Sequence, residues 1–219
     1  MYILLICLVL IVVLYSFSAK GLAEQLIFNL IVVALLISVV FILKQTKRSL
    51  AVSLILGVPW TVAVFVDLFV VQDRTLYLFT TAAGIPFLLF VTAIVFQHVL
   101  RSKRATADTI YGAICVYLLL GIVWAAGYRF LESLNPGSFS GPMGIDTETG
   151  IEIPSYLYYS FTTLTTLGYG DVTPVSASAR SIAILEAVAG PLYITILISQ
   201  LVSKYVSRKG ESETEDSQV

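Results

Sequence analysis

The chain has 219 residues, of which 58% are hydrophobic, and its mean hydropathy is +0.91. A soluble domain is nearer about 45–50% apolar, so this composition indicates an integral membrane protein. Thirteen basic and fourteen acidic residues nearly cancel, so net charge identifies no partner. The single histidine excludes a multi-histidine centre, and neither a nucleophile–base pair nor a phosphate-binding loop is evident. We therefore expect no enzyme activity, no cofactor and no nucleic-acid partner.

Six apolar runs are candidates to cross a membrane. They cover residues 2–18, 22–43, 51–71, 76–100, 110–131 and 178–205. The first run is either a signal peptide or a retained span. No basic residue precedes its apolar core and no clear cleavage site follows it, which favours a retained span. The third run is expected to be interrupted at Pro59.

The distribution of basic residues predicts the orientation. Clusters at 44–48, 101–104 and 204–209 hold nine of the thirteen Lys and Arg residues. Cytoplasmic loops carry this excess in membrane proteins. Six spans would then leave both termini in the cytoplasm and the loop after residue 165 outside the cell, in a plasma-membrane protein.

That loop reads Thr-Leu-Gly-Tyr-Gly-Asp over residues 166–171. Gly168 and Gly170 can take positive φ without steric cost, which lets successive carbonyls point the same way. A ring of such carbonyl rows can replace the hydration shell of a potassium ion. Residues 156–165 are too short to span and suit a half-crossing helix, whose C-terminal dipole favours a cation.

Residues 163–171, placed between the last two apolar runs, resemble the signature of the pore-loop potassium channel superfamily. The chain is similar to a six-span channel of prokaryotic type that lacks voltage-sensor arginines. The resemblance is specific over residues 155–205 and only topological before residue 110.

This resemblance implies an all-α membrane protein with a four-span bundle followed by a two-span pore module. Residues 1–106 would form the non-voltage-sensing bundle. Residues 107–207 would form the pore domain, with outer helix, extracellular loop, re-entrant pore helix, filter and inner helix. Residues 208–219 would be a short cytoplasmic tail.

The resemblance also assigns the filter. The residues expected to bind potassium are Thr166, Leu167, Gly168, Tyr169 and Gly170. One loop cannot surround an ion, and homo-oligomers prefer closed symmetry, so a homotetramer is expected. Leu167 replaces the commoner valine or isoleucine of the family, for which we expect altered packing and retained selectivity.

The family pattern further implies residues that brace the filter. Asp171 would hydrogen-bond an aromatic cuff formed by Tyr158 and Tyr159, with Tyr159 the expected partner. The alternative for both tyrosines is anchoring at the membrane interface. Thr162 occupies the position where some relatives carry a glutamate coupled to the aspartate, so that linkage is in doubt here.

The last apolar run resembles the pore-lining inner helix. Gly190 and Pro191 predict a kink near residues 187–191, which is either a gating hinge or a static bend. Glu186 is a carboxylate inside a membrane helix, which is costly unless it is paired, protonated or hydrated. We expect it to contact Thr162 or Thr163, in a regulatory or a purely structural role.

Three apolar residues follow at helical spacing and are assigned to the cavity and inner mouth, with simple helix packing as the alternative. They are Ile194, Ile198 and Val202.

The run at 76–100 contains no arginine, so steep voltage gating is not expected. The sequence thus predicts a homotetrameric potassium-selective channel without steep voltage dependence, whose partners are K⁺, membrane lipid and its own copies. The alternatives are a nonselective cation channel and a non-conducting pore-like sensor or subunit.

Overall fold

The computed structural model describes residues 1–15, 30, 33–34, 37–38, 47–67, 74–102, 106–141, 144–145, 152–153 and 155–216. Four helices in these ranges are long and apolar enough to cross a membrane. They are α3 (Lys47–Asp67), α4 (Arg74–Arg101), α5 (Ala107–Leu134) and α7 (Ala177–Asp216). Helix α1 (Tyr2–Tyr15) is apolar but shorter, and α6 (Ser155–Leu164) has ten residues. Most of the predicted span at 22–43 lies outside the described residues.

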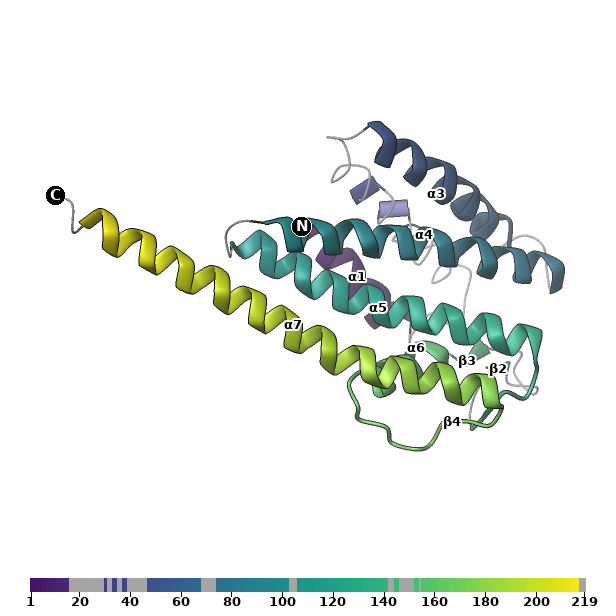
Figure 1. Ribbon diagram of the computed structural model, residues 1–219. Coiled ribbons are helices and arrows are strands. Elements are labelled where there is room, and N and C mark those ends of the chain that lie inside the picture. Colours follow the sequence, from purple (N-terminus) through teal and green to yellow (C-terminus); the bar gives the residue numbers. More distant parts are fainter. Residues whose placement is uncertain are drawn as a thin grey trace.

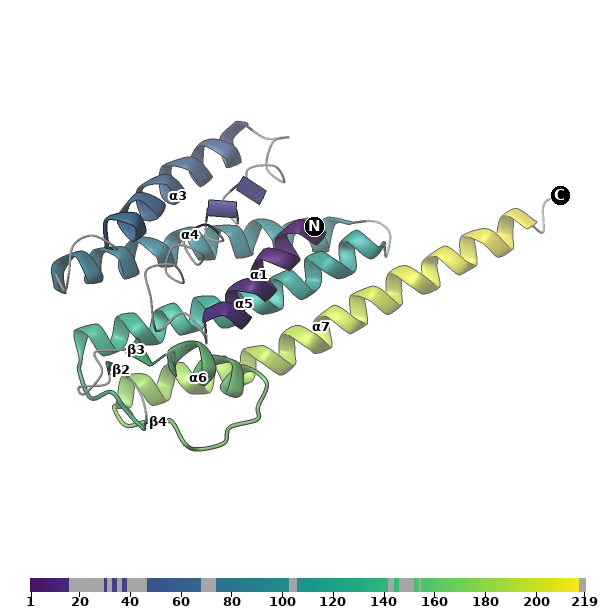
Figure 2. The same cartoon turned by 180° about the vertical axis from the view of Figure 1, so that it is seen from behind.

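The helices form a layered bundle around α5. Helix α4 lies along one side of α5, and α3 packs on the far side of α4 (Figure 1). Helix α1 contacts α5 from behind (Figure 2). The short helix α6 contacts both α5 and α7, and α7 extends well past the other helices towards the C-terminus (Figure 1). The segment after α6 is therefore positioned by the two helices that flank it.

The predicted spans at 76–100, 110–131 and 178–205 and the half-helix at 156–165 are confirmed as helices. The interruption expected at Pro59 is wrong, because α3 continues through this residue. Its missing N–H removes one bond of the helical ladder, which membrane helices tolerate through local adjustment. Helix α7 also continues beyond residue 207, so most of the segment predicted as a separate tail extends the inner helix.

The core of the bundle joins the front helices to α5. Leu4 and Leu8 of α1, Phe87 and Val91 of α4, and Leu119 of α5 are fully buried in one cluster. Large apolar side chains at helical spacing dictate this burial, since each fills the space between neighbouring helices. The helices before residue 107 thus pack directly against the outer helix of the expected pore.

A glycine allows α3 and α4 to approach closely. A Cβ at Gly84 would lie 2.7 Å from the indole nitrogen of Trp60, and the Trp60 ring also packs on Phe87 with centroids 5.3 Å apart. The ring of Trp60 occupies the space that a side chain at position 84 would need. This contact fixes α3 against α4.

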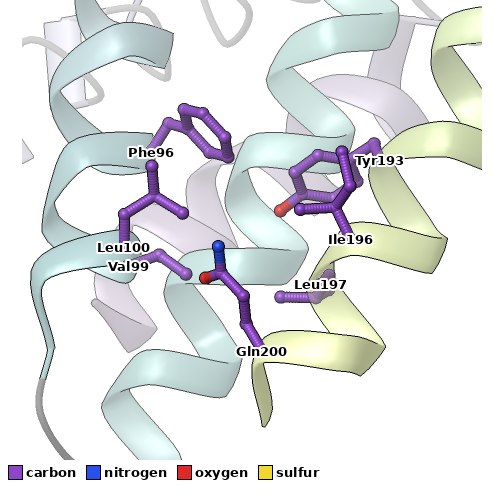
Figure 3. Close-up of a pocket in the computed structure, with 7 residues that line it drawn as sticks. All are labelled: Phe96, Val99, Leu100, Tyr193, Ile196, Leu197 and Gln200. Atoms are coloured by element: carbon purple, nitrogen blue, oxygen red, sulfur yellow. The ribbon is translucent and has the colours of Figure 1, made fainter. Parts of the chain in front are cut away.

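A small pocket lies between the C-terminal part of α4 and the middle of α7. It is lined by Phe96, Val99, Leu100, Tyr193, Ile196, Leu197 and Gln200 (Figure 3). Gln200 directs its amide into this otherwise apolar space (Figure 3). The hydroxyl of Tyr193 donates to the carbonyl of Ala113 at 2.6 Å, which ties α7 to α5 beside the pocket.

Short strands bring the loop after α5 to the segment that precedes α7. Strand β1 (Phe139–Ser140) pairs antiparallel with β4 (Thr173–Pro174). Strand β2 (Gly144–Ile145) pairs with β3 (Glu152–Ile153). Gly141 has φ +121°, and a Cβ there would lie 2.3 Å from the carbonyl oxygen of Asp171. The outer loop therefore rests directly on the segment that follows residue 170.

Two glycines of α5 provide a matched test of the packing between α5 and α6. A Cβ at Gly121 would lie 2.7 Å from the ring of Phe161, whereas a Cβ at Gly127 would meet nothing within 4 Å. We expect Gly121→Ala to lower the free energy of unfolding by about 1–3 kcal/mol through overpacking. Gly127→Ala should raise it by about 0.5–1 kcal/mol, because alanine is the better helix former. Denaturant titration in detergent micelles measures both, and equal effects would contradict this packing.

Candidate functional site

The C-terminal end of α6 is held against the two flanking helices. A Cβ added to Gly190 of α7 would lie 2.0 Å from the carbonyl oxygen of Leu164, so only glycine permits this approach. The hydroxyl of Tyr117 on α5 donates to the same oxygen at 3.4 Å. Gly190, predicted as a hinge or bend, thus lies where the backbone of α7 closely approaches the end of α6.

The segment after α6 has an alternating backbone. Thr166 has φ +58°, Gly168 has φ +50° and Gly170 has φ +80°, whereas Leu167 and Tyr169 have no positive φ. In an ordinary strand successive carbonyls point to opposite sides; left-handed residues at every second position can bring them to one side. The two glycines adopt the conformation expected from the sequence. The positive φ of Thr166 was not predicted and is strained for a β-branched residue.

Backbone amides at the start of this segment are bonded back into α6. Leu167 and Gly168 both donate to the carbonyl oxygen of Thr162, at 2.8 and 3.1 Å, and Thr166 donates to that of Thr163 at 2.9 Å. Thr162 thus braces the segment through its backbone, while its hydroxyl donates to the carbonyl of Tyr159 at 2.9 Å.

The carbonyl oxygens of the same segment are free. In the described part of the chain, none of the carbonyls of residues 166–170 accepts a hydrogen bond. The side chains of Leu167 and Tyr169 are 55% and 68% exposed in the single chain. The amides of Thr166, Leu167 and Gly168 are bonded to α6, whereas the carbonyls of residues 166–170 are not used, so the segment offers a run of unpaired oxygen ligands. Oxygen ligands of this kind suit a hard cation.

Asp171 is hydrogen-bonded to an aromatic residue, as expected, but the partner is Tyr158 and not Tyr159. The Tyr158 hydroxyl donates to Oδ2 at 2.7 Å, and the Val172 amide donates to Oδ1 at 3.0 Å. The rings of Tyr158 and Tyr169 stack with centroids 6.4 Å apart and an interplanar angle of 6°. The bond from Tyr158, above all, lowers the pKa of Asp171 below its ordinary value of 3.8.

Tyr159 instead belongs to a buried aromatic cluster. Its ring lies 4.9 Å from that of Tyr128 and 5.3 Å from that of Phe139, both edge-on. Phe139 also contacts Tyr128 and Tyr156. Edge-to-face pairs of this kind add to area burial. The cluster joins α5, α6 and the loop that follows α5.

Glu186 is fully buried, and its partners differ from those expected. Its carboxyl contacts Ser160 of α6 at 2.5 Å and accepts a hydrogen bond from the Tyr128 hydroxyl of α5, and no bond to Thr162 or Thr163 is found. Sequence reasoning missed Ser160 and Tyr128. Each of the two helices carries several residues with a hydroxyl group, and the sequence does not indicate which of them faces α7.

Ile194, Ile198 and Val202 lie on a face of α7 that the described part of the chain leaves uncovered. They are 42%, 55% and 55% exposed, whereas Tyr193 on the side facing α5 is 8% exposed. Helical residues Thr195 and Pro191 remain linked by a bond from the Thr195 hydroxyl to the Pro191 carbonyl at 2.8 Å. The placement fits both an expected cavity lining and contact with another copy.

Residues 116–207 match the family model described as "Ion channel". A mouse protein named potassium voltage-gated channel subfamily A member 5 is 29% identical over 96 residues, which are 43% of this chain and 14% of the relative. The two pore potassium channel c of Oryza sativa subsp. japonica is 33% identical over 87 residues, covering 40% and 18%. This part of the chain is similar to potassium channels.

The matched segment spans less than a fifth of each of these relatives. The rat voltage-gated potassium channel KCNC4 is likewise matched over a small part of its length, with 28% identity over 53% of this chain and 18% of the relative. No solved structure matches the chain. Together with the long apolar helices, these relatives support a membrane protein of ion transport, which fits the expectation that it is not an enzyme.

Replacing Gly190 by alanine tests whether this residue serves close packing. The added Cβ must displace a backbone oxygen, so we expect Gly190→Ala to lower the free energy of unfolding by about 3 kcal/mol. Val188→Ala, at a position 52% exposed on the same helix, is the control and should change stability little. If Gly190 acted only as a hinge, unfolding in detergent would be unchanged and gating alone would be affected.

The two adjacent tyrosines of α6 differ in their effect on Asp171. Tyr158→Phe removes the donor that lowers the pKa of Asp171, so this pKa should rise towards its ordinary value. Tyr159→Phe should leave it unchanged. Since the folded-state pKa is lowered, the bond contributes at neutral pH and is lost as pH falls through that pKa. A carboxyl ¹³C NMR titration measures the shift, and a rise in Tyr159→Phe alone would contradict the assignment.

Proposed function

We propose that the protein is a homotetrameric potassium-selective channel in which residues 166–170 form the filter. The observation that supports this most directly is the alternation of positive φ at Thr166, Gly168 and Gly170. The first three amides of the segment are bonded to α6, and its carbonyls accept no hydrogen bond in the described part of the chain. Four such segments around one axis would surround a dehydrated potassium ion with backbone oxygens. A single segment cannot do so, which is the reason for the tetramer.

The surface of α7 supports assembly. Apolar side chains cover the part of this helix that the chain's own helices leave open, among them Ile184 and Leu185, which are 64% and 61% exposed. Lipid or neighbouring copies would cover such a surface in a membrane. In the proposed tetramer, α7 would be the pore-lining inner helix, α6 the re-entrant pore helix and the face with Ile198 and Val202 the lining of the inner mouth.

The front helices lack the charges that steep voltage gating requires. Helix α4 carries no charged residue between positions 75 and 97, and it packs along α5. Moving one charge through the membrane field supplies about 2.3 kcal/mol per 100 mV. The channel is therefore proposed to conduct without steep voltage dependence, with both termini in the cytoplasm and the filter facing outside.

The test is the reversal potential in planar bilayers with potassium on one side and sodium on the other. We expect a value near the potassium equilibrium potential. Gly168→Ala should abolish selectivity or current, because the residue has φ +50° and alanine strains this backbone. Gly127→Ala, at an open site on α5, is the matched control and should conduct like the wild type.

The other outcomes separate the alternatives. A reversal potential near zero would indicate a nonselective cation channel, in which Leu167 is the first residue to replace by valine. Absence of current from a tetramer verified by crosslinking would contradict the channel and favour a non-conducting sensor or subunit.

A further inference from the structure

Glu186 lies in a closed polar site that the conduction path does not use. The residue is fully buried, and the Tyr128 hydroxyl donates to its Oε2. Its Oε1 lies 2.5 Å from Oγ of Ser160. In the described part of the chain, no lysine, arginine or histidine lies within salt-bridge distance of this carboxyl. An unpaired carboxylate at such a place in a membrane helix is costly.

The hydrogens available at Ser160 decide the direction of the bonds. Its Oγ also lies 2.7 Å from the carbonyl oxygen of Gly121 on α5. A serine hydroxyl has a single hydrogen, and a carbonyl oxygen can only accept. If Ser160 donates to Gly121, the hydrogen between Ser160 and Glu186 must come from the carboxyl.

We propose that Glu186 is a neutral carboxylic acid that donates to Ser160 and thereby positions the pore helix. The bonds then run in one direction: Tyr128 donates to Glu186, Glu186 to Ser160, and Ser160 to Gly121. Each polar hydrogen has one acceptor, and the chain of bonds leaves α5, passes through α7 and α6, and returns to α5. Helix α6 is thereby fixed through Ser160 to both α5 and α7.

Loss of the proton would break this arrangement. Ser160 would turn its only hydrogen to the carboxylate, and its bond to Gly121 would be lost. The titratable groups that face Glu186 are Tyr117 and Tyr128 on α5 and Tyr159 on α6, all of them phenols that supply no positive charge. The neutral acid therefore holds α6, and alkaline pH releases it.

The consequence for current depends on the proposed channel function, whereas the state of the proton does not. The first experiment is therefore infrared difference spectroscopy of the detergent-solubilised protein at neutral pH, with ¹³C-labelled glutamate. A carboxylic-acid C=O band that shifts with the label and is missing from Glu186→Gln supports the proposal. Absence of such a band in the wild type overturns it, whatever the variants do.

Thermal unfolding gives a second, independent readout. Glutamine can accept from Tyr128 with its oxygen and donate to Ser160 with its nitrogen, so Glu186→Gln should unfold close to the wild-type temperature. Ser160→Ala removes the link and should unfold at a lower temperature. Ser181→Ala, which removes an exposed hydroxyl of α7, is the control and should have no effect. A Glu186→Gln protein as unstable as Ser160→Ala would overturn the proposal. That result would mean that Glu186 is an ionised carboxylate that accepts hydrogen bonds from both Tyr128 and Ser160, and the NH₂ group of glutamine cannot accept one.

Where the protein conducts, the pH profile of potassium current completes the test. We expect the wild-type current to fall as the pH rises and the Glu186→Gln current to stay constant. An equal fall in both proteins would overturn the role of Glu186 in positioning α6. A protein that never conducts contradicts the proposed function. The infrared and unfolding experiments still test the protonation of Glu186 in that case.

Discussion

The close approach of α7 to α6 is the constraint on which the rest of the site depends. Gly190 admits the carbonyl of Leu164 at a distance that any side chain would block, and Glu186, one turn earlier, meets Ser160 on the same face. Since the amides of Leu167 and Gly168 are bonded to the last turn of α6, the position of α6 sets that of the filter segment. A shift of α7 would therefore be transmitted to residues 166–170, the proposed filter, through α6.

The membrane makes the unpaired carbonyls of residues 166–170 energetically important. Within a bilayer each unsatisfied backbone group costs several kcal/mol, so irregular backbone persists only where protein, water or an ion satisfies it. In the described part of the chain, the carbonyls of residues 166–170 accept no hydrogen bond, although the first three amides of this segment are bonded to α6. In the proposed tetramer, water and the permeant ion would supply the missing partners. The same unpaired oxygens that would destabilise an isolated chain would thus create the binding sites.

The sequence predicted the helices and the glycine conformations, because apolar length and the freedom of glycine at positive φ are local properties. Which of Tyr158 and Tyr159 bonds to Asp171 depends instead on contacts between helices. Adjacent residues on a helix point about 100° apart, and the rotation of α6 about its axis is set by its contacts with α5 and α7. The partners of Glu186 were missed for the same reason. The run at 22–43 lies largely outside the described residues, so its prediction stays open.

The filter segment is held at its two ends by different means. At the start, the amides of Leu167 and Gly168 donate to the carbonyl of Thr162, which belongs to the buried part of α6. At the end, Asp171 is fixed by the exposed Tyr158 and by the outer loop, where Gly141 lies against its carbonyl. Exposed hydrogen bonds exchange with water and contribute less than buried ones. In the proposed channel, the end at Asp171 would be the part of the filter that conditions outside the cell can reach, whereas the end at Thr166 would respond to α7.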